Sequence, residues 1–305
     1  MVDILEYWDR DAAARLCAAI GMPPEATEAI LPEYGRFDPA SIARAFPLLL
    51  DRATGPAGVA AIEPAVAATG ARAPWVWLAI LLAAAARRRQ LDREMGIPGA
   101  VTMDTLAALS RFVRDFYTQE GRWGFKGQGW IWRQLSGGIY RIGVLEFERF
   151  RYPGPALGEG DNALTPGEKL LSVHIPGDAV LTEAAIADAY ARAEGFFARF
   201  APDWDYQKFY CDSWMLSPRL NKLLRPASRI LRFQRDYEIL EFNGEDCHYI
   251  RWIFGAQTDP ALFKEETSLQ RSVKAYVLAG GRVGAGVGVF AKGRYGLIDA
   301  DRPIQ

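Results

Sequence analysis

The chain has 305 residues, of which 50% are hydrophobic, and its 36 basic and 37 acidic side chains give a formal net charge of -1. This length and apolar content favour two domains over one. The nearly balanced charge provides no field that would attract nucleic acid or an anionic membrane, so we expect neither as a partner.

The cysteines and the N-terminus bear on cellular location. Cys17, Cys211 and Cys247 are odd in number and lack CxxC or Cys/His metal spacing, so we predict neither a disulfide framework nor a metal site. Residues 1–9 are acidic and aromatic, unlike the basic start of a secretory signal, and we expect a cytoplasmic protein. The longest apolar run, 74–86, is shorter than the ~20 residues that span a bilayer, and we interpret it as a buried helix.

Residues 1 to about 135 are rich in alanine and carry helix boundary signals rather than alternation. Asp11 is placed to cap one helix, and Asp38-Pro39 is typical of the start of another. The longer helices expected here span residues 12–20, 74–94 and 104–119. A joint rich in glycine and tryptophan follows at 121–132, which we interpret as core and inter-domain packing.

After Gly137-Gly138 the pattern changes to the alternation of half-buried strands. The expected strands span residues 139–151, 170–175, 209–213, 230–233, 249–254 and 283–290. The expected helices span 181–200, 218–224 and 268–280, and the last of them begins with the spacing of a capping box, Thr267 to Gln270. In strand 283–290 glycines line one face, which lets another backbone or a ligand approach closely.

The strand 170–175, the helix 181–200 and the strand 209–213 have the order of a parallel crossover unit. Such units bind ligands at the carboxyl ends of their strands. His174 stands at the first of these ends, and Cys211 to Ser213 stand at the second. The sequence therefore predicts a site that these residues share.

Several segments resemble the bacterial acyltransferase-domain proteins. They are Tyr140 to Phe147, Val173-His174-Ile175-Pro176, Cys211 to Leu216, Ile230 to Phe233 and Thr267 to Arg271. The resemblance covers most of the chain and is strongest from about 120 to 290. It implies a two-domain α+β or α/β protein, with an all-helical N-terminal domain at 1–136 and a GNAT-like (N-acetyltransferase-like) mixed sheet with flanking helices at 137–305.

The resemblance also implies a function, the transfer of an acyl group from acyl-CoA to a small-molecule amine. Proteins with this fold hold the pyrophosphate of CoA in the loop between a strand and the next helix, at a helix N-terminus. The matching loop residues here are Gly177, Asp178 and Ala179, with Thr182 as the expected helix N-cap. The loop has one glycine where the family pattern has two or three, and Asp178 and Glu183 add negative charge there. A non-catalytic binding module with a degenerate CoA site is therefore the alternative.

Acyl transfer needs a base, and His174 is the natural choice if it faces a cavity, because an unperturbed histidine titrates near neutral pH. Asp212 or Ser213 would orient His174, and Cys211 would serve as an acid or a covalent nucleophile. The structural alternative is a buried cysteine beside a helix cap, with a histidine that fixes the strand end. A third hypothesis, cysteine-dependent chemistry without CoA, requires a reactive Cys211. The weaker candidates are Glu146 and Glu148 as bases, and Arg232 and Arg235 as contacts for an anionic ligand.

Overall fold

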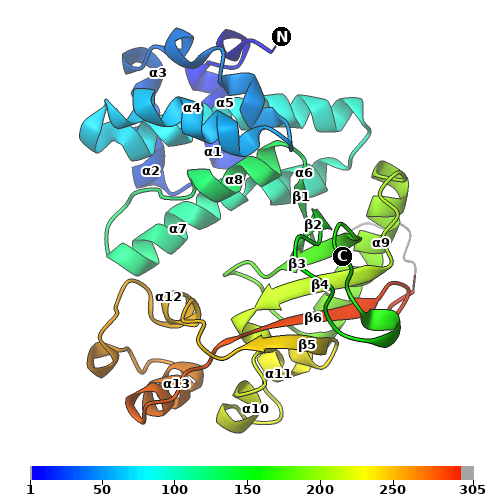
Figure 1. Ribbon diagram of the computed structural model, residues 1–305. Coiled ribbons are helices and arrows are strands. Elements are labelled where there is room, and N and C mark those ends of the chain that lie inside the picture. The colour runs from blue at the N-terminus through cyan, green and yellow to red at the C-terminus, as the bar shows by residue number, and fades with distance from the viewer. Residues whose placement is uncertain (1, 297–305) are drawn as a thin grey trace. The chain divides into compact units, whose positions relative to one another are not determined.

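The structure is a computed structural model that describes residues 2–296. The chain divides into two compact units between Arg141 and Ile142 (Figure 1). The sequence places the boundary after residue 136, and this exact position stays a prediction. We describe each unit by itself.

The first unit is helical, as the sequence predicts. Its α-helices are α1 (Arg10–Ala19), α2 (Pro24–Ile30), α3 (Glu33–Arg36), α4 (Gly55–Ala67), α5 (Ala73–Glu94), α6 (Gly99–Leu106), α7 (Ala108–Glu120) and α8 (Gln128–Leu135). Short 3-10 helices span Ile4–Glu6, Pro39–Ile42, Phe46–Leu50 and Gly70–Arg72. Two details differ from expectation: Asp9 caps α1 in place of Asp11, and the helix expected at 104–119 is divided between α6 and α7.

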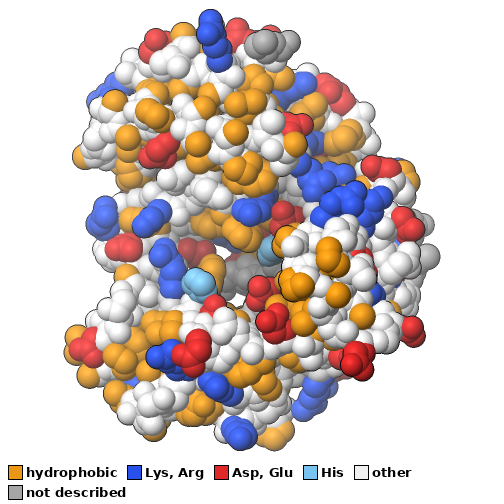
Figure 2. All heavy atoms as spheres, viewed as in Figure 1, with side chains coloured by type: hydrophobic (Ala, Val, Ile, Leu, Met, Phe, Trp, Pro, Cys, Tyr) orange, Lys and Arg blue, Asp and Glu red, His pale blue; other side chains and the backbone are white. Residues whose placement is uncertain are grey.

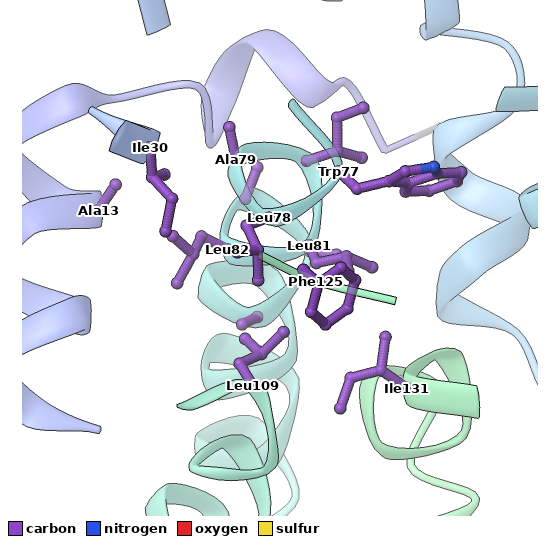
Figure 3. Close-up of a cluster of buried hydrophobic side chains, with 14 of the residues drawn as sticks. Ala13, Ile30, Trp77, Leu78, Ala79, Leu81, Leu82, Leu109, Phe125 and Ile131 are labelled. Carbon is purple, nitrogen blue, oxygen red and sulfur yellow. The ribbon is translucent and has the colours of Figure 1, made fainter. Parts of the chain in front are cut away.

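Helix α5 is the centre of this unit. Its middle, residues 76–85, is buried on every side, which explains why the sequence here is apolar throughout rather than amphipathic. Figure 3 shows Leu78, Leu81 and Leu82 of α5 among side chains from other elements, with Phe125 and Ile131 close to it. Among residues 2–296, no helix combines the length and the apolar character needed to cross a membrane.

The second unit contains most of the mixed sheet. The strands are β1 (Ile139–Ile142), β2 (Leu145–Arg151), β3 (Lys169–His174), β4 (Lys208–Ser213), β5 (Glu238–Asn243) and β6 (Ala285–Ala291). Their order is β1-β2-β3-β4-β6-β5, with β3 and β4 parallel and the β2–β3, β4–β6 and β5–β6 pairs antiparallel. The α-helices are α9 (Glu183–Phe200), α10 (Leu220–Leu223), α11 (Arg229–Gln234), α12 (Tyr249–Phe254) and α13 (Ser268–Leu278).

Two expected strands are helices, and one strand was not expected. Residues 230–233 lie in α11 and residues 249–254 form α12, whereas β5 was missed. Short apolar runs do not separate a strand from a buried helical turn by periodicity alone. The capping box is confirmed: the Thr267 hydroxyl accepts from the Gln270 amide, and the Gln270 side chain accepts from the Thr267 amide.

Helix α9 packs on one face of the sheet through an aromatic core. The Tyr190 ring lies 5.1 Å from Phe209 and 4.9 Å from Phe290, measured between centroids. Its hydroxyl shares a 2.7 Å hydrogen bond with the hydroxyl of Tyr237. Helix α9 therefore covers this face, and any polar site on the sheet lies on the other face.

The glycines of β6 are explained by close approach of other parts of the chain. A Cβ on Gly286 would lie 2.7 Å from the carbonyl oxygen of Leu216, in the 3-10 helix Trp214–Leu216 that follows β4. A Cβ on Gly288 would lie 3.0 Å from the Cβ of Tyr237. The glycine face thus admits neighbouring protein segments.

Candidate active site

Strands β3 and β4 run side by side in parallel, and α9 connects them. Their registered pairs are Leu171 with Phe209 and Ser172 with Tyr210. Both strands continue beyond these pairs, to His174 and to Ser213. The sequence correctly predicts this crossover unit and the strand ends.

His174 contacts a carboxylate on the neighbouring strand at hydrogen-bond distance. Its Nε2 lies 2.9 Å from Oε2 of Glu148, and the two side chains are 24% and 17% exposed. Glu146 stands directly opposite His174 in the β2–β3 register, and is buried. The imidazole is thus held by a carboxylate on the neighbouring strand and is partly open to solvent, the placement that a general base needs.

Asp212 lies on the same face of the sheet as His174. Tyr210 is in register with Ser172, and side chains two residues further along each strand return to the same face. Partial burial raises the pKa of Asp212, and the charges of Asp246 and Glu241 raise it further. Glu241 stands opposite Val287, which is itself opposite Asp212. His174, Asp212 and Glu241 therefore form a row across the sheet.

Cys211 is not part of this face. It alternates with Asp212, so its side chain points into the aromatic core under α9, and the residue is 0% exposed. Burial raises the pKa of the thiol well above its ordinary value, the charge of Asp212 adds to this rise, and a hydrogen bond with Tyr237 opposes it. The site that we expected His174 and Cys211 to share is not formed, because successive residues of a strand face opposite sides and Cys211 lies on the other face from Asp212 and His174.

Ser213 shares the strand face of Cys211 and has a structural contact. Its hydroxyl accepts a hydrogen bond from the Met215 amide at 3.2 Å and so caps the 3-10 helix Trp214–Leu216. Of the four residues proposed from the sequence as catalytic, the structure places His174 and Asp212 on one face. It places Cys211 and Ser213 on the other.

The loop after β3 leads into the N-terminus of α9. Thr182 caps that helix as expected, and its hydroxyl accepts from the Ala185 amide at 3.3 Å. The Ala179 amide donates to the carbonyl of Pro176, so it is used within the loop. Gly177 and Asp178 are exposed.

Glu183, the first residue of α9, has a positive partner. Nη1 of Arg232 donates to Oε2 of Glu183 at 2.7 Å. The first-turn amides of a helix attract an anion, and Arg232 offsets the carboxylate that would repel it. The sequence shows the repelling charge of Glu183, whereas its neutralising partner is 49 residues away along the chain.

Figure 2 shows carboxylates beside the pale-blue imidazole groups on the viewed face. Within residues 2–296, no cluster of three or more His, Cys, Asp or Glu side chains is arranged to hold a metal ion. The face of the sheet that carries His174 and Asp212 offers groups that can accept or donate protons.

Two family models match the chain. One, described as the N-acyltransferase N-terminal domain, matches residues 11–137. The other, described as the GNAT-like C-terminal domain, matches residues 139–290. The chain belongs to the acyltransferase family with this pair of domains. The helical N-terminal region and the mixed sheet with flanking helices that we expected from the resemblance are thus confirmed.

Solved structures of acyltransferases resemble this family member over nearly its whole length. An acyltransferase in complex with decanoyl-CoA and teicoplanin is 25% identical, with a TM-score of 0.76, and the match covers 92% of this chain and 87% of that one. A tryptophan-to-alanine mutant of an acyltransferase in complex with octanoyl-CoA is 25% identical, with a TM-score of 0.77, and the match covers 92% and 88%. A search of curated protein sequences gave no match.

Proposed function

We propose that this chain transfers an acyl group from acyl-CoA to the amine of a small-molecule acceptor. The observation that carries the proposal is the match, over 92% of the chain, to acyltransferases that were crystallised with acyl-CoA. The His174–Glu148 pair at the carboxyl end of β3 supplies an acid–base group in the unit that matches the GNAT-like domain.

The reaction requires few groups from the protein. The amine nitrogen attacks the thioester carbonyl, the C–N bond forms and the C–S bond breaks. His174 takes the proton that the nitrogen loses, and the imidazolium is stabilised by Glu148, 2.9 Å away. The imidazolium then gives this proton to the CoA thiolate as it leaves, so the products are the amide and the free thiol of CoA. Asp212, on the same face, attracts the ammonium form of the acceptor, which releases one proton to water before the neutral amine attacks.

The loop after β3 and the first turn of α9 fit the pyrophosphate of CoA. Two of the four residues proposed from the sequence, Gly177 and Asp178, are exposed in the loop. The Ala179 amide donates to a carbonyl within the loop, and Thr182 caps the start of α9. The amides of Glu183 and Ala184 in the first turn have no intrahelical acceptor by geometry. Because Arg232 pairs with Glu183, a pyrophosphate meets less repulsion here than the sequence suggests.

The acceptor is proposed at the level of an amine. One related acyltransferase was solved with teicoplanin, a glycopeptide, which supports an acceptor that is a small molecule. The cytoplasmic location expected from the sequence stays a prediction, and it would give this chain access to acyl-CoA.

A pair of histidine variants tests the proposal. The chain has two histidines, and His248 is also paired with a carboxylate, with Nδ1 2.8 Å from Oδ2 of Asp246, but its side chain is 87% exposed. We expect His174→Gln to lower the rate of amine-dependent CoA release by about 10²- to 10⁴-fold. His248→Gln is expected to change it less than about twofold. Equal rates for wild type and His174→Gln would contradict the assignment of His174 as the base.

A further inference from the structure

One segment of this nearly neutral chain is strongly basic. Residues 217–235 contain six basic side chains and no acidic one. They are Arg219, Lys222, Arg225, Arg229, Arg232 and Arg235. The segment includes α10 and α11 and connects the 3-10 helix after β4 to β5. Such local separation of charge indicates a surface that attracts anions.

The contacts of these side chains divide them into two groups. Arg219 is structural, because its Nη1 donates to the carbonyls of Gly244 and Arg282 at 3.0 and 2.7 Å. The other five basic residues of the segment are exposed. Among them, Arg235 donates to the carbonyl of Pro226 at 3.2 Å.

One member of the exposed group, Arg232, lies beside the helix start proposed for pyrophosphate. Helix α11 packs against α9, and Arg232 of α11 contacts Glu183, the first residue of α9. Arg229 and Arg232 are three residues apart on α11, so their side chains are neighbours. The Arg232–Glu183 pair is 45% and 74% exposed, so the guanidinium is open to solvent. A guanidinium carries five N–H donors, so Arg232 can contact a phosphate with its other donors while Nη1 stays on Glu183.

We propose that Arg229 and Arg232 bind the 3′-phosphate of CoA, so that this protein selects CoA over its 3′-dephosphorylated form. The inference rests on the proposed function, and it adds a second anion subsite next to the first turn of α9. The ribose 3′-phosphate is a few bonds from the pyrophosphate and carries about two negative charges at neutral pH. Arginine presents a planar, paired donor set that matches phosphate oxygens.

Calorimetric titration of the full chain with CoA, 3′-dephospho-CoA and inorganic phosphate tests this. A charge-assisted contact contributes about 1.5 kcal/mol at the low end, so we expect wild type to bind CoA about tenfold more tightly than dephospho-CoA. The ratio should shrink as salt rises, because exposed charges are screened. Inorganic phosphate should bind far more weakly than CoA.

Variants separate the roles of the two arginines. Arg229→Gln is expected to reduce the CoA to dephospho-CoA ratio to about twofold while its affinity for dephospho-CoA stays at the wild-type value, which also shows that it folds. Arg232→Gln is expected to weaken both ligands, since Glu183 loses its partner. Adding Glu183→Gln to it should restore dephospho-CoA binding without restoring the ratio. Arg251→Gln, an exposed arginine of α12, is the matched control and should keep the ratio.

The outcomes distinguish this inference from the proposed function. Equal affinity of wild type for CoA and dephospho-CoA overturns the 3′-phosphate subsite and leaves the proposed function intact. A wild-type ratio that Arg229→Gln and Arg232→Gln both preserve also overturns it. The absence of binding to either nucleotide contradicts the proposed function itself.

Discussion

At the residue scale, alternation along β4 decides which side chains act together. Asp212 shares the face of His174, whereas Cys211 is enclosed on the opposite face with a raised pKa. A buried thiol of raised pKa is a poor nucleophile. The hypothesis of cysteine-dependent chemistry at Cys211 has no support in this geometry, and we do not propose it.

The surroundings of the Asp212 carboxylate lower the stability of the folded protein at neutral pH, and this effect can be measured. Its pKa is raised above the ordinary 3.8, so the folded state binds the proton more tightly than the unfolded chain does. Stability therefore falls as pH rises through 3.8 to the folded pKa, and it stays lower at neutral pH. We expect Asp212→Asn to be more stable than wild type at pH 7 by less than about 1 kcal/mol, with the advantage lost below pH ~3.5.

Thermal unfolding of the two proteins across this pH range checks the expectation. A destabilised Asp212→Asn at pH 7, or an advantage that persists at low pH, would mean that Asp212 is not under electrostatic strain. A gain in stability accompanied by a loss of amine-dependent CoA release would support its place in the site.

The sequence predicts part of this site. His174 and Asp212 are found because strand ends are visible as alternation followed by a helix cap. Two features of the site cannot be predicted from the sequence. Alternation does not say which face of a strand is covered, so Cys211 and Asp212 look equally available. The Glu148 contact depends on antiparallel register between β2 and β3, and the Arg232 contact depends on packing of α11 against α9.

At the element scale, the crossover unit could be predicted because its signals are long and consistent. Helix α9 has a cap at Thr182 and an apolar stripe, and β3 and β4 flank it. The errors fall on short elements: α11 and α12 have six residues each, and apolar or aromatic residues make up half of α11 and most of α12. Strand β5 was missed because its residues are half-buried or exposed, which leaves a weak hydrophobic signal.

The glycines of β6 give a test at this scale. A Cβ on Gly286 would lie 2.7 Å from the carbonyl oxygen of Leu216, so β6 or the 3-10 helix must shift. We expect Gly286→Ala to lower the free energy of unfolding by about 1–3 kcal/mol, as measured by denaturant titration. Gly129→Ala in α8 is the control, since its Cβ would meet no atom within 4 Å. It should be neutral or stabilising by up to about 1 kcal/mol. Equal stability of the two variants would show that the close approach is absent.

At the scale of the whole molecule, composition and charge predict no nucleic-acid or membrane partner, which stays a prediction, and they do not indicate an activity. The resemblance of the sequence to acyltransferase-domain proteins implies acyl transfer, and this agrees with the two family models that match 11–137 and 139–290. Fold alone does not determine function. The residues that make the proposal specific are His174 with Glu148 on the sheet, and Arg232 with Glu183 at the start of α9.

The most direct test of the account is one assay with the purified 305-residue protein, an acyl-CoA of eight to ten carbons and a set of amine acceptors. Mass spectrometry would measure the acylated amine while free CoA is measured in parallel. The account predicts equal amounts of acylated amine and CoA for at least one acceptor, together with loss of both products in His174→Gln. CoA release without an acylated amine, or no release with any acceptor despite tight acyl-CoA binding, would contradict it.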